Sequence, residues 1–256
     1  MKIYQSEYDI ADLILANRSI SCEASLSPII DSDKEFFNKQ FENLSSLFAK
    51  ASINDSDLYY RKSILVSTTW NKNDDVFNNE EVWVSRNTPS HKPTNIGHKE
   101  SDIVGHITGT WATAEDGTLI PDNTILDALP DFYHLNNGSV IYTAFEDKDM
   151  KSRASELIAS IEAGTKYVSM ETMFANFDYA VITPEKEKYI VQRNKETAFL
   201  TKHLRFYKGT GEFDGCRVGR LLRNITFTGK GYVDKPANPY SIIFGADDSL
   251  SFTKAS

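Results

Sequence analysis

The stretch KYVSMETMF, at positions 166–174, shows most directly how the middle of this chain folds. It contains the β-branched and aromatic residues that strands favour, and it follows a helical pattern that ends at Gly164. We therefore expect a strand here. Eight further runs of the same kind follow from position 62 onward: KSILVSTTW (62–70), EVWVSR (81–86), DIVGHITGTWA (102–112), SVIYTAF (139–145), DYAVITP (178–184), KYIVQR (188–193), NITFTGKGYVD (224–234) and YSIIFG (240–245).

Three amphipathic helices are expected beside these strands. The first covers 33–50, where apolar residues recur at helical spacing: Phe37, Phe41, Leu44 and Phe48. The other two cover 148–163 and 195–207. The pattern predicts an α+β protein with a mostly β core, a closed or strongly bent sheet surrounded by a few helices. Small polar residues flank the first helix, so we expect residues 1–55 to form an N-terminal helical extension and 56–256 the main domain.

Composition excludes several classes of protein. The chain has 256 residues and a net charge of −8, which gives no basic footprint for nucleic acid. No run approaches the roughly 18 apolar residues of a membrane span, so no membrane partner is expected. Only Cys22 and Cys216 are present, far apart, which favours a reducing cytoplasm and predicts neither a disulfide framework nor a zinc site.

The five histidines differ in their local sequence. His91 and His134 lie in polar segments and are expected to be exposed. His203 belongs to the late helix, where a structural role is the simpler interpretation. His98 stands at the end of a loop that enters a strand, a position where a rigid scaffold commonly presents a reactive group. His98 is therefore the candidate general base.

Ser169 is the candidate nucleophile, because it lies within a probable strand rather than a loop. Alternate residues of a strand share one face, so Ser169 and Glu171 are expected to point the same way. A serine nucleophile needs a base within reach and a third group that orients the base. The same pattern also fits an ordinary polar strand face at a sheet surface, and both interpretations stay open at this point.

Other common site motifs are missing from the sequence. It has no GxxxxGK[ST] phosphate loop, no GxGxxG after a first strand, no HExxH or CxxC metal spacing and no GxSxG nucleophile elbow. The glycine-rich run GTGEFDG at 209–215 follows a helix and precedes a strand, which is the reverse of the order that a phosphate site requires. We interpret it as a turn.

Three stretches, taken together, resemble a known family. The first, within 70–109, has the pattern Asn-x-x-His, then an acidic residue, then Ile-x-Gly, at Asn95, His98, Glu100, Ile103 and Gly105. The second is Val-Ser-Met-Glu at 168–171, and the third is Pro-Ala-Asn at 236–238. In this order they resemble the prohead proteases of tailed bacteriophages, which are distantly similar to herpesvirus assemblin. The resemblance covers most of 60–245 and none of the first 55 residues.

The resemblance implies a serine endopeptidase with a β-barrel core wrapped by helices. His98 would be its general base and Ser169 its nucleophile, and residues 56–256 would form the protease domain. Such an enzyme cleaves scaffold or core proteins and the major capsid protein inside the immature prohead, in the host cell cytoplasm, and then cleaves itself. The resemblance implies no cofactor, and by analogy with the assemblins it is compatible with a homo-oligomer.

The third catalytic residue departs from the family pattern. Related proteases often carry an acidic residue close to the place of Gly229, where this chain has none. Glu171 is preferred, because it would lie beside Ser169 and could accept a hydrogen bond from the ring nitrogen of His98 that does not face the serine. Asp234 is the second choice, and Asp178, expected in the following turn, is interpreted as structural. By analogy with the assemblins, an arginine-containing turn at 217–223 is expected near the oxyanion site.

Two other functions remain as alternatives. One is a catalytically inactive, protease-like structural protein of the phage head or core. The other is a serine esterase or a related acyl hydrolase with the same site chemistry.

Overall fold

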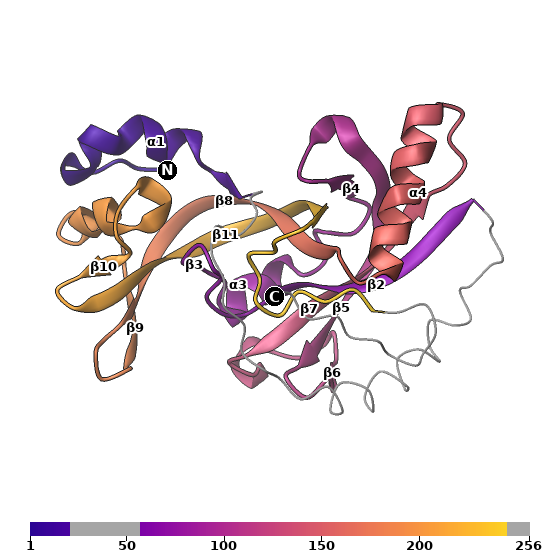
Figure 1. The fold of residues 1–256 in the computed structure, drawn as a ribbon. Helices are drawn as coiled ribbons and strands as arrows, with labels where there is room; N and C mark the ends of the chain where they lie inside the picture. Colours follow the sequence, from indigo (N-terminus) through magenta and orange to yellow (C-terminus); the bar gives the residue numbers. More distant parts are fainter. Residues whose placement is uncertain (21–56, 245–256) are drawn as a thin grey trace.

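The computed structural model describes residues 1–20 and 57–244 as one strongly bent sheet with short helices at its edges (Figure 1). The expected α+β class with a mostly β core is confirmed. The longer strands are β2 (Leu58–Ser67), β5 (Ile103–Ala114), β7 (Tyr133–Tyr142), β8 (Tyr167–Ile182) and β11 (Cys216–Val233). The shorter strands are β1 (Ser19–Ile20), β3 (Asp75–Val76), β4 (Pro93–Ile96), β6 (Leu119–Ile120), β9 (Lys188–Val191) and β10 (Glu212–Phe213).

The helices are short apart from one. The α-helices are α1 (Ala11–Ala16), α3 (Asn79–Ser85) and α4 (Lys148–Glu162). The 3-10 helices are η1 (Gln5–Ile10), η3 (Glu100–Asp102), η4 (Leu126–Ala128), η5 (Ala198–His203) and η6 (Arg205–Tyr207). No helix within the described ranges is long and apolar enough to cross a membrane.

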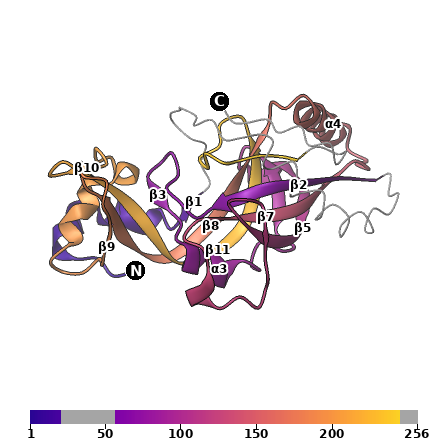
Figure 2. The same cartoon turned by 90° about the horizontal axis from the view of Figure 1, so that it is seen from below.

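The sheet has the strand order β1-β8-β11-β4-β5-β7-β2, so β11 lies between β8 and β4. β8 and β11 form a long antiparallel ribbon that reaches from the β9 and β10 end of the molecule to the curled half near α4 (Figures 1 and 2). The ladder runs from the pair Arg217–Ile182 to the pair Val233–Tyr167, and β4 joins β11 in parallel beside its last residues. The sheet curls because right-handed twist accumulates over strands of this length.

The expected helix at 148–163 is confirmed as α4. Its first turn is capped by the Asp147 side chain, which accepts a hydrogen bond from the Met150 backbone N–H at 2.9 Å. Its buried stripe consists of Ala154, Leu157 and Ile161. The helix ends where Gly164 takes a φ of +69°, which a residue with a Cβ adopts only at a cost.

Several expected elements differ from the structure. The run 81–86 forms α3 instead of a strand, because Asn78 caps it by accepting from the Glu81 N–H at 2.9 Å, a helical signal that outweighs the β-branched valines. The expected helix at 195–207 is two short 3-10 helices, η5 and η6. The two strands expected at 166–174 and 178–184 are one strand, β8. The run 240–245 forms no named strand within its described part and contributes one isolated bridge, between Ile243 and Ser63.

The first 20 residues pack on the main body. β1 pairs with β8, with Ile20 opposite Thr172. The buried carboxylate of Glu7 binds the Arg193 guanidinium at 2.6 Å, and both side chains are at most 1% exposed. The helix expected at 33–50 lies outside the described residues, as do Cys22 and the rest of the segment that links β1 to β2.

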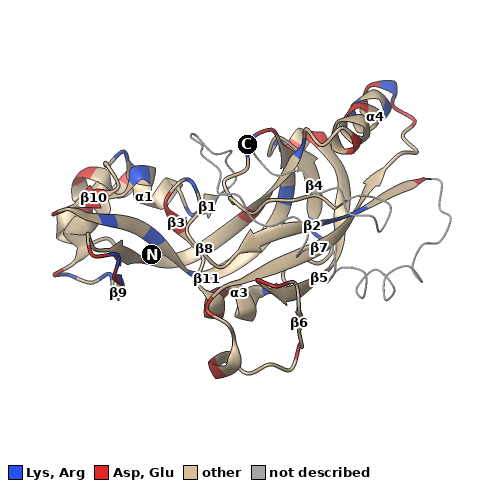
Figure 3. Cartoon of the chain, turned by 60° about the horizontal axis from the view of Figure 1, so that its bottom comes forward, with Lys and Arg blue, Asp and Glu red and all other residues tan. Residues whose placement is uncertain are grey.

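Acidic and basic side chains are interspersed along the chain rather than segregated by sign (Figure 3).

Candidate active site

β8 carries Ser169 and Glu171 on one face of the sheet. In the β8–β11 ladder Ser169 lies opposite Gly231, and Glu171 lies opposite Gly229. Directly opposed residues of an antiparallel pair place their side chains on the same face, about 5 Å apart. Since both opposed residues are glycines, β11 leaves open space beside the serine and beside the carboxylate.

The imidazole of His98 fills the space at Gly231. A Cβ on Gly231 would lie 2.7 Å from His98 Nδ1 and 2.9 Å from Cε1, so the ring occupies the volume of the missing side chain. A Cβ on Gly229 would in turn lie 2.5 Å from Glu171 Oε2. His98 is therefore the cross-strand neighbour of Ser169, although it belongs to the loop after β4.

The backbone of that loop aims the ring at β11. Gly97 and His98 both take the left-handed conformation, with φ of +61° and +59°. Such a φ is uncommon for a residue other than glycine and is concentrated at functional sites. The Gly97 N–H donates to the Tyr232 carbonyl at 3.0 Å, which anchors the turn to β11.

The Glu171 carboxylate is hydrogen-bonded to the Nδ1 of His98. The distance from His98 Nδ1 to Glu171 Oε1 is 3.0 Å, and the His98 side chain is 5% exposed. Burial by itself raises the pKa of Glu171, but hydrogen bonds from His98 and Asn95 outweigh it and leave the pKa below its usual value. Glu171 is therefore ionised at neutral pH and accepts from Nδ1–H, so that Nε2 carries the lone pair.

His98 Nε2 is buried and has no hydrogen-bond partner among the described residues. The Ser169 side chain lies on the same face, and Ser169 is 3% exposed. Within residues 1–20 and 57–244 no hydrogen bond joins the Ser169 hydroxyl to His98. Catalytic hydrogen bonds are often long in the free enzyme and tighten when substrate binds. The arrangement offers a hydroxyl, an unpartnered imidazole nitrogen and an orienting carboxylate on one face of the sheet.

The alternative carboxylates lie elsewhere. Asp234 lies beyond the end of β11 and binds the Lys166 ammonium at 2.5 Å. Asp178 is within β8, not in a turn as expected, and it accepts from Arg223 Nε at 2.8 Å and from the Arg193 N–H at 2.9 Å. Neither contacts His98. Asp178 joins β8 to its neighbours, in agreement with a structural role.

The expected arginine turn at 217–223 is wrong, because these residues form the first part of β11. Their guanidinium groups are held by carboxylates away from His98. Arg217 binds Asp74, and Arg220 binds Asp75 at 2.7 Å with both side chains at most 1% exposed. The sequence could not show that each arginine has a structural partner, because these partners lie far away in the chain.

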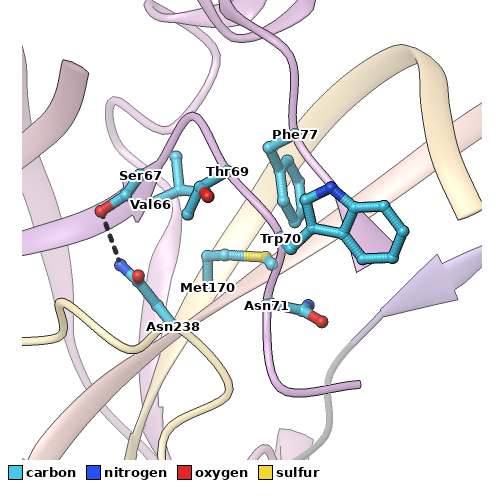
Figure 4. A pocket seen from close by; sticks show the side chains of 8 residues that line it. All are labelled: Val66, Ser67, Thr69, Trp70, Asn71, Phe77, Met170 and Asn238. Atoms are coloured by element: carbon cyan, nitrogen blue, oxygen red, sulfur yellow. Dashed lines mark hydrogen bonds between the residues drawn. The ribbon is translucent and has the colours of Figure 1, made fainter. Parts of the chain in front are cut away.

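His134 was expected to be exposed, but it is fully buried in β7. Its Nδ1 lies 2.8 Å from Ser67 Oγ, and burial lowers the pKa of His134 to about 4. Ser67, Asn238 and Met170 line a small pocket on the opposite face of β8 from Ser169 (Figure 4). There Asn238, from the Pro-Ala-Asn signature, donates to Ser67 Oγ at 3.2 Å. His134 is 0% exposed and Ser67 is 2% exposed, and their contact joins β7 to β2 within the core.

Two other histidines fit their sequence contexts. His91 is exposed, and His203 lies in η5 with its ring packed on Phe213. Cys216 is a free thiol. No cluster of His, Cys, Asp or Glu that could hold a metal ion is present in the described part of the chain.

Sequence reasoning assigned no role to three residues of the site. Asn95 donates to Glu171 Oε1 at 2.6 Å, and Gly229 and Gly231 provide the space for Glu171 and His98. The signals were present in the sequence, as the asparagine three residues before His98 and as the Gly-Lys-Gly run. Their meaning depends on the order of the strands, which the pattern does not reveal.

No family model, no curated protein and no solved structure matches the chain.

Proposed function

We propose that this chain is a serine hydrolase of peptide bonds, with Ser169 as nucleophile, His98 as general base and Glu171 as the group that orients His98. One observation carries the proposal. The imidazole is hydrogen-bonded to Glu171 through Nδ1 and occupies the side-chain space of Gly231, the residue opposite Ser169. Its Nε2 has no partner in the part of the chain that the structure describes.

The mechanism follows from these positions. Ser169 Oγ attacks the scissile carbonyl carbon, and its proton moves to His98 Nε2. The C–N bond breaks, the leaving amine takes that proton, and the acyl group remains on Ser169. A water molecule, which gives its proton to Nε2, hydrolyses the ester, and the proton returns to Ser169. Glu171 stabilises the imidazolium in both halves of the reaction.

The particular enzyme we propose is a head-maturation protease of a tailed bacteriophage, with a fold similar to herpesvirus assemblin. The support comes from the ordered motifs at Asn95–His98, at 168–171 and at 236–238, and from the mostly β sheet that carries them. Its substrates would be the scaffold or core proteins and the major capsid protein inside the prohead, and it would also cleave itself.

The first experiment labels the purified chain with a fluorophosphonate, which reacts preferentially with an activated serine. The wild-type protein is expected to be labelled and the Ser169→Ala variant is not. Ser155→Ala is the matched control, because Ser155 lies on the exposed side of α4 with its hydroxyl bonded to the Lys151 carbonyl. Labelling of Ser169→Ala at the wild-type rate would contradict the nucleophile assignment.

The second experiment coexpresses the chain with the scaffold and major capsid proteins of the same phage, and follows cleavage by mass spectrometry. Cleavage of both, lost in Ser169→Ala, supports the protease. Intact substrates together with an unlabelled wild-type chain favour an inactive structural protein of the head. Hydrolysis of small esters without peptide cleavage favours an esterase.

A further inference from the structure

The carboxylate of Glu171 has a second hydrogen-bond donor besides His98. The Asn95 amide Nδ2 donates to Oε1 at 2.6 Å, the same oxygen that lies 3.0 Å from His98 Nδ1. The opposite orientation of the amide would bring its oxygen against a carboxylate oxygen, so the donor assignment follows from charge. One oxygen atom thus joins the asparagine and the histidine.

The position of Asn95 is set by three strands. Asn95 lies in β4, opposite Gly231 of β11 and opposite Ile103 of β5, and it is 3% exposed. The β4–β5 register shifts between Thr94 and Asn95. Irregularities of this kind re-aim a side chain and are frequent beside active sites. Since Gly229 and Gly231 have no side chains, no β11 side chain separates the amide from the carboxylate on β8.

We propose that Asn95 is a positioning residue of the candidate active site, whose amide holds Glu171 Oε1 where it accepts the Nδ1–H of His98. This inference rests on the proposed function. Glu171 Oε2 lies in the space that a Gly229 side chain would occupy, and within the described residues the carboxylate is hydrogen-bonded only by His98 and Asn95. Without the amide, His98 alone holds the carboxylate, which can then rotate and release Nδ1. The imidazole is then free to place its proton on either nitrogen, and only one tautomer can accept the serine proton.

An amide suits this position better than a carboxylate or an aliphatic group. It donates without adding a second negative charge next to Glu171, and it compensates for burial of the carboxylate. A hydrogen bond to a charged group is worth enough to change a rate by roughly 10- to 100-fold when it acts only through the orientation of the base.

The test compares Asn95→Ala with the wild-type protein in peptide cleavage. We expect kcat to fall by roughly 10- to 100-fold while KM changes less than about twofold, since Asn95 orients the base and does not bind substrate. In proton NMR spectra, the downfield Nδ1–H signal of His98 is expected to disappear or broaden. A variant that is merely less stable would keep this signal in its folded fraction.

Asn136→Ala is the matched control. Asn136 is also a buried amide whose Nδ2 makes one hydrogen bond, to Thr113 Oγ1 at 2.9 Å, and whose Oδ1 has no partner among the described residues. It lies in β7, away from Glu171. We expect this variant to lose stability to a similar extent and to keep kcat and the His98 signal.

If the alanine variant does not fold, Asn95→Asp tests whether the amide donor positions Glu171. Aspartate has nearly the size of asparagine and so leaves no cavity. Once ionised, the introduced carboxylate cannot donate, so kcat is expected to decrease as pH rises through ionisation of the carboxylate pair. A wild-type kcat and an intact Nδ1–H signal in whichever of these variants folds would overturn the proposal. A wild-type protein without cleavage or fluorophosphonate labelling would instead overturn the proposed function on which it rests.

Discussion

At the scale of single residues, the candidate site depends on the lack of a side chain at Gly231. Gly231 has no Cβ, and the His98 ring occupies that volume with Nδ1 and Cε1 at 2.7 and 2.9 Å from where the Cβ would be. These separations are far below van der Waals contact, and the neighbouring backbone of Gly97 is fixed by its bond to Tyr232. The ring must therefore move if any side chain is added.

We expect Gly231→Ala to displace His98 from the carboxylate of Glu171 and to reduce kcat by at least about 100-fold, in line with the loss of an oriented base. Peptide cleavage and fluorophosphonate labelling measure the effect. Gly109→Ala is the control, because a Cβ at Gly109 meets nothing within 4 Å. An active Gly231→Ala variant would show that the ring does not need this position.

At the scale of elements, the two faces of β11 have opposite chemistry. Gly229 and Gly231 face the candidate site, whereas Lys230 between them points into the core. Its ammonium donates to Ser63 Oγ, Asn137 Oδ1 and Ser139 Oγ at 3.1, 2.9 and 2.7 Å. All three acceptors are neutral, and burial lowers the pKa of Lys230 to about 7.

This lysine is expected to make stability depend on pH. In the unfolded chain Lys230 keeps its proton up to about 10.5, whereas in the folded protein it loses the proton near 7. Between these values the unfolded state binds more protons, so the free energy of unfolding rises with pH. From pH 7 to 9 the rise amounts to about 2 kcal/mol.

Urea unfolding of the wild-type protein and of Lys230→Met at several pH values measures this effect. In the Lys230→Met variant the free energy of unfolding is expected to rise less with pH, because the buried amine is gone. Lys166→Met is the control, since Lys166 lies at the surface beside the exposed Asp234. If the free energy of unfolding changed equally with pH in the wild-type protein and in Lys230→Met, Lys230 would not be the source of the pH dependence.

At the scale of the whole molecule, the N-terminal residues belong to the folded body. Glu7 accepts from Arg193 Nε and Nη2 at 2.8 and 2.6 Å and from Thr201 Oγ1 at 2.6 Å, and it is 0% exposed. This carboxylate therefore joins η1 to the segment after β9 and to η5. The contact spans 186 residues of sequence, so it forms only when the chain is folded.

We expect Glu7→Ala to destabilise the protein by about 3 to 5 kcal/mol, because it leaves the buried Arg193 without its counter-ion. The melting temperature should fall by roughly 10 °C, measured by circular dichroism. Asp9→Ala, which removes an exposed carboxylate from the same 3-10 helix, should change it by about 2 °C or less. Equal melting temperatures for the two variants would show that residues 1–20 do not support the main body.

The sequence by itself determined the mostly β class, the capped helix α4 and the shared face of Ser169 and Glu171. These features depend on residues close together in the chain, through side-chain periodicity and local capping. The same local reasoning failed for 81–86, where a cap outweighed strand propensity, and for His134, whose polar neighbours are themselves buried.

Only the tertiary structure decided which strands lie side by side. It placed β11 between β8 and β4, and this order brings His98 to Glu171 across 73 residues of sequence and adds Asn95 to the same carboxylate. It also gave a role to Gly229 and Gly231, which the pattern only placed in a strand, because they leave the space that Glu171 and His98 occupy. The physical reason is that strand pairing and burial are set by the packing of the whole sheet, and side-chain periodicity within one strand carries no information about its neighbours.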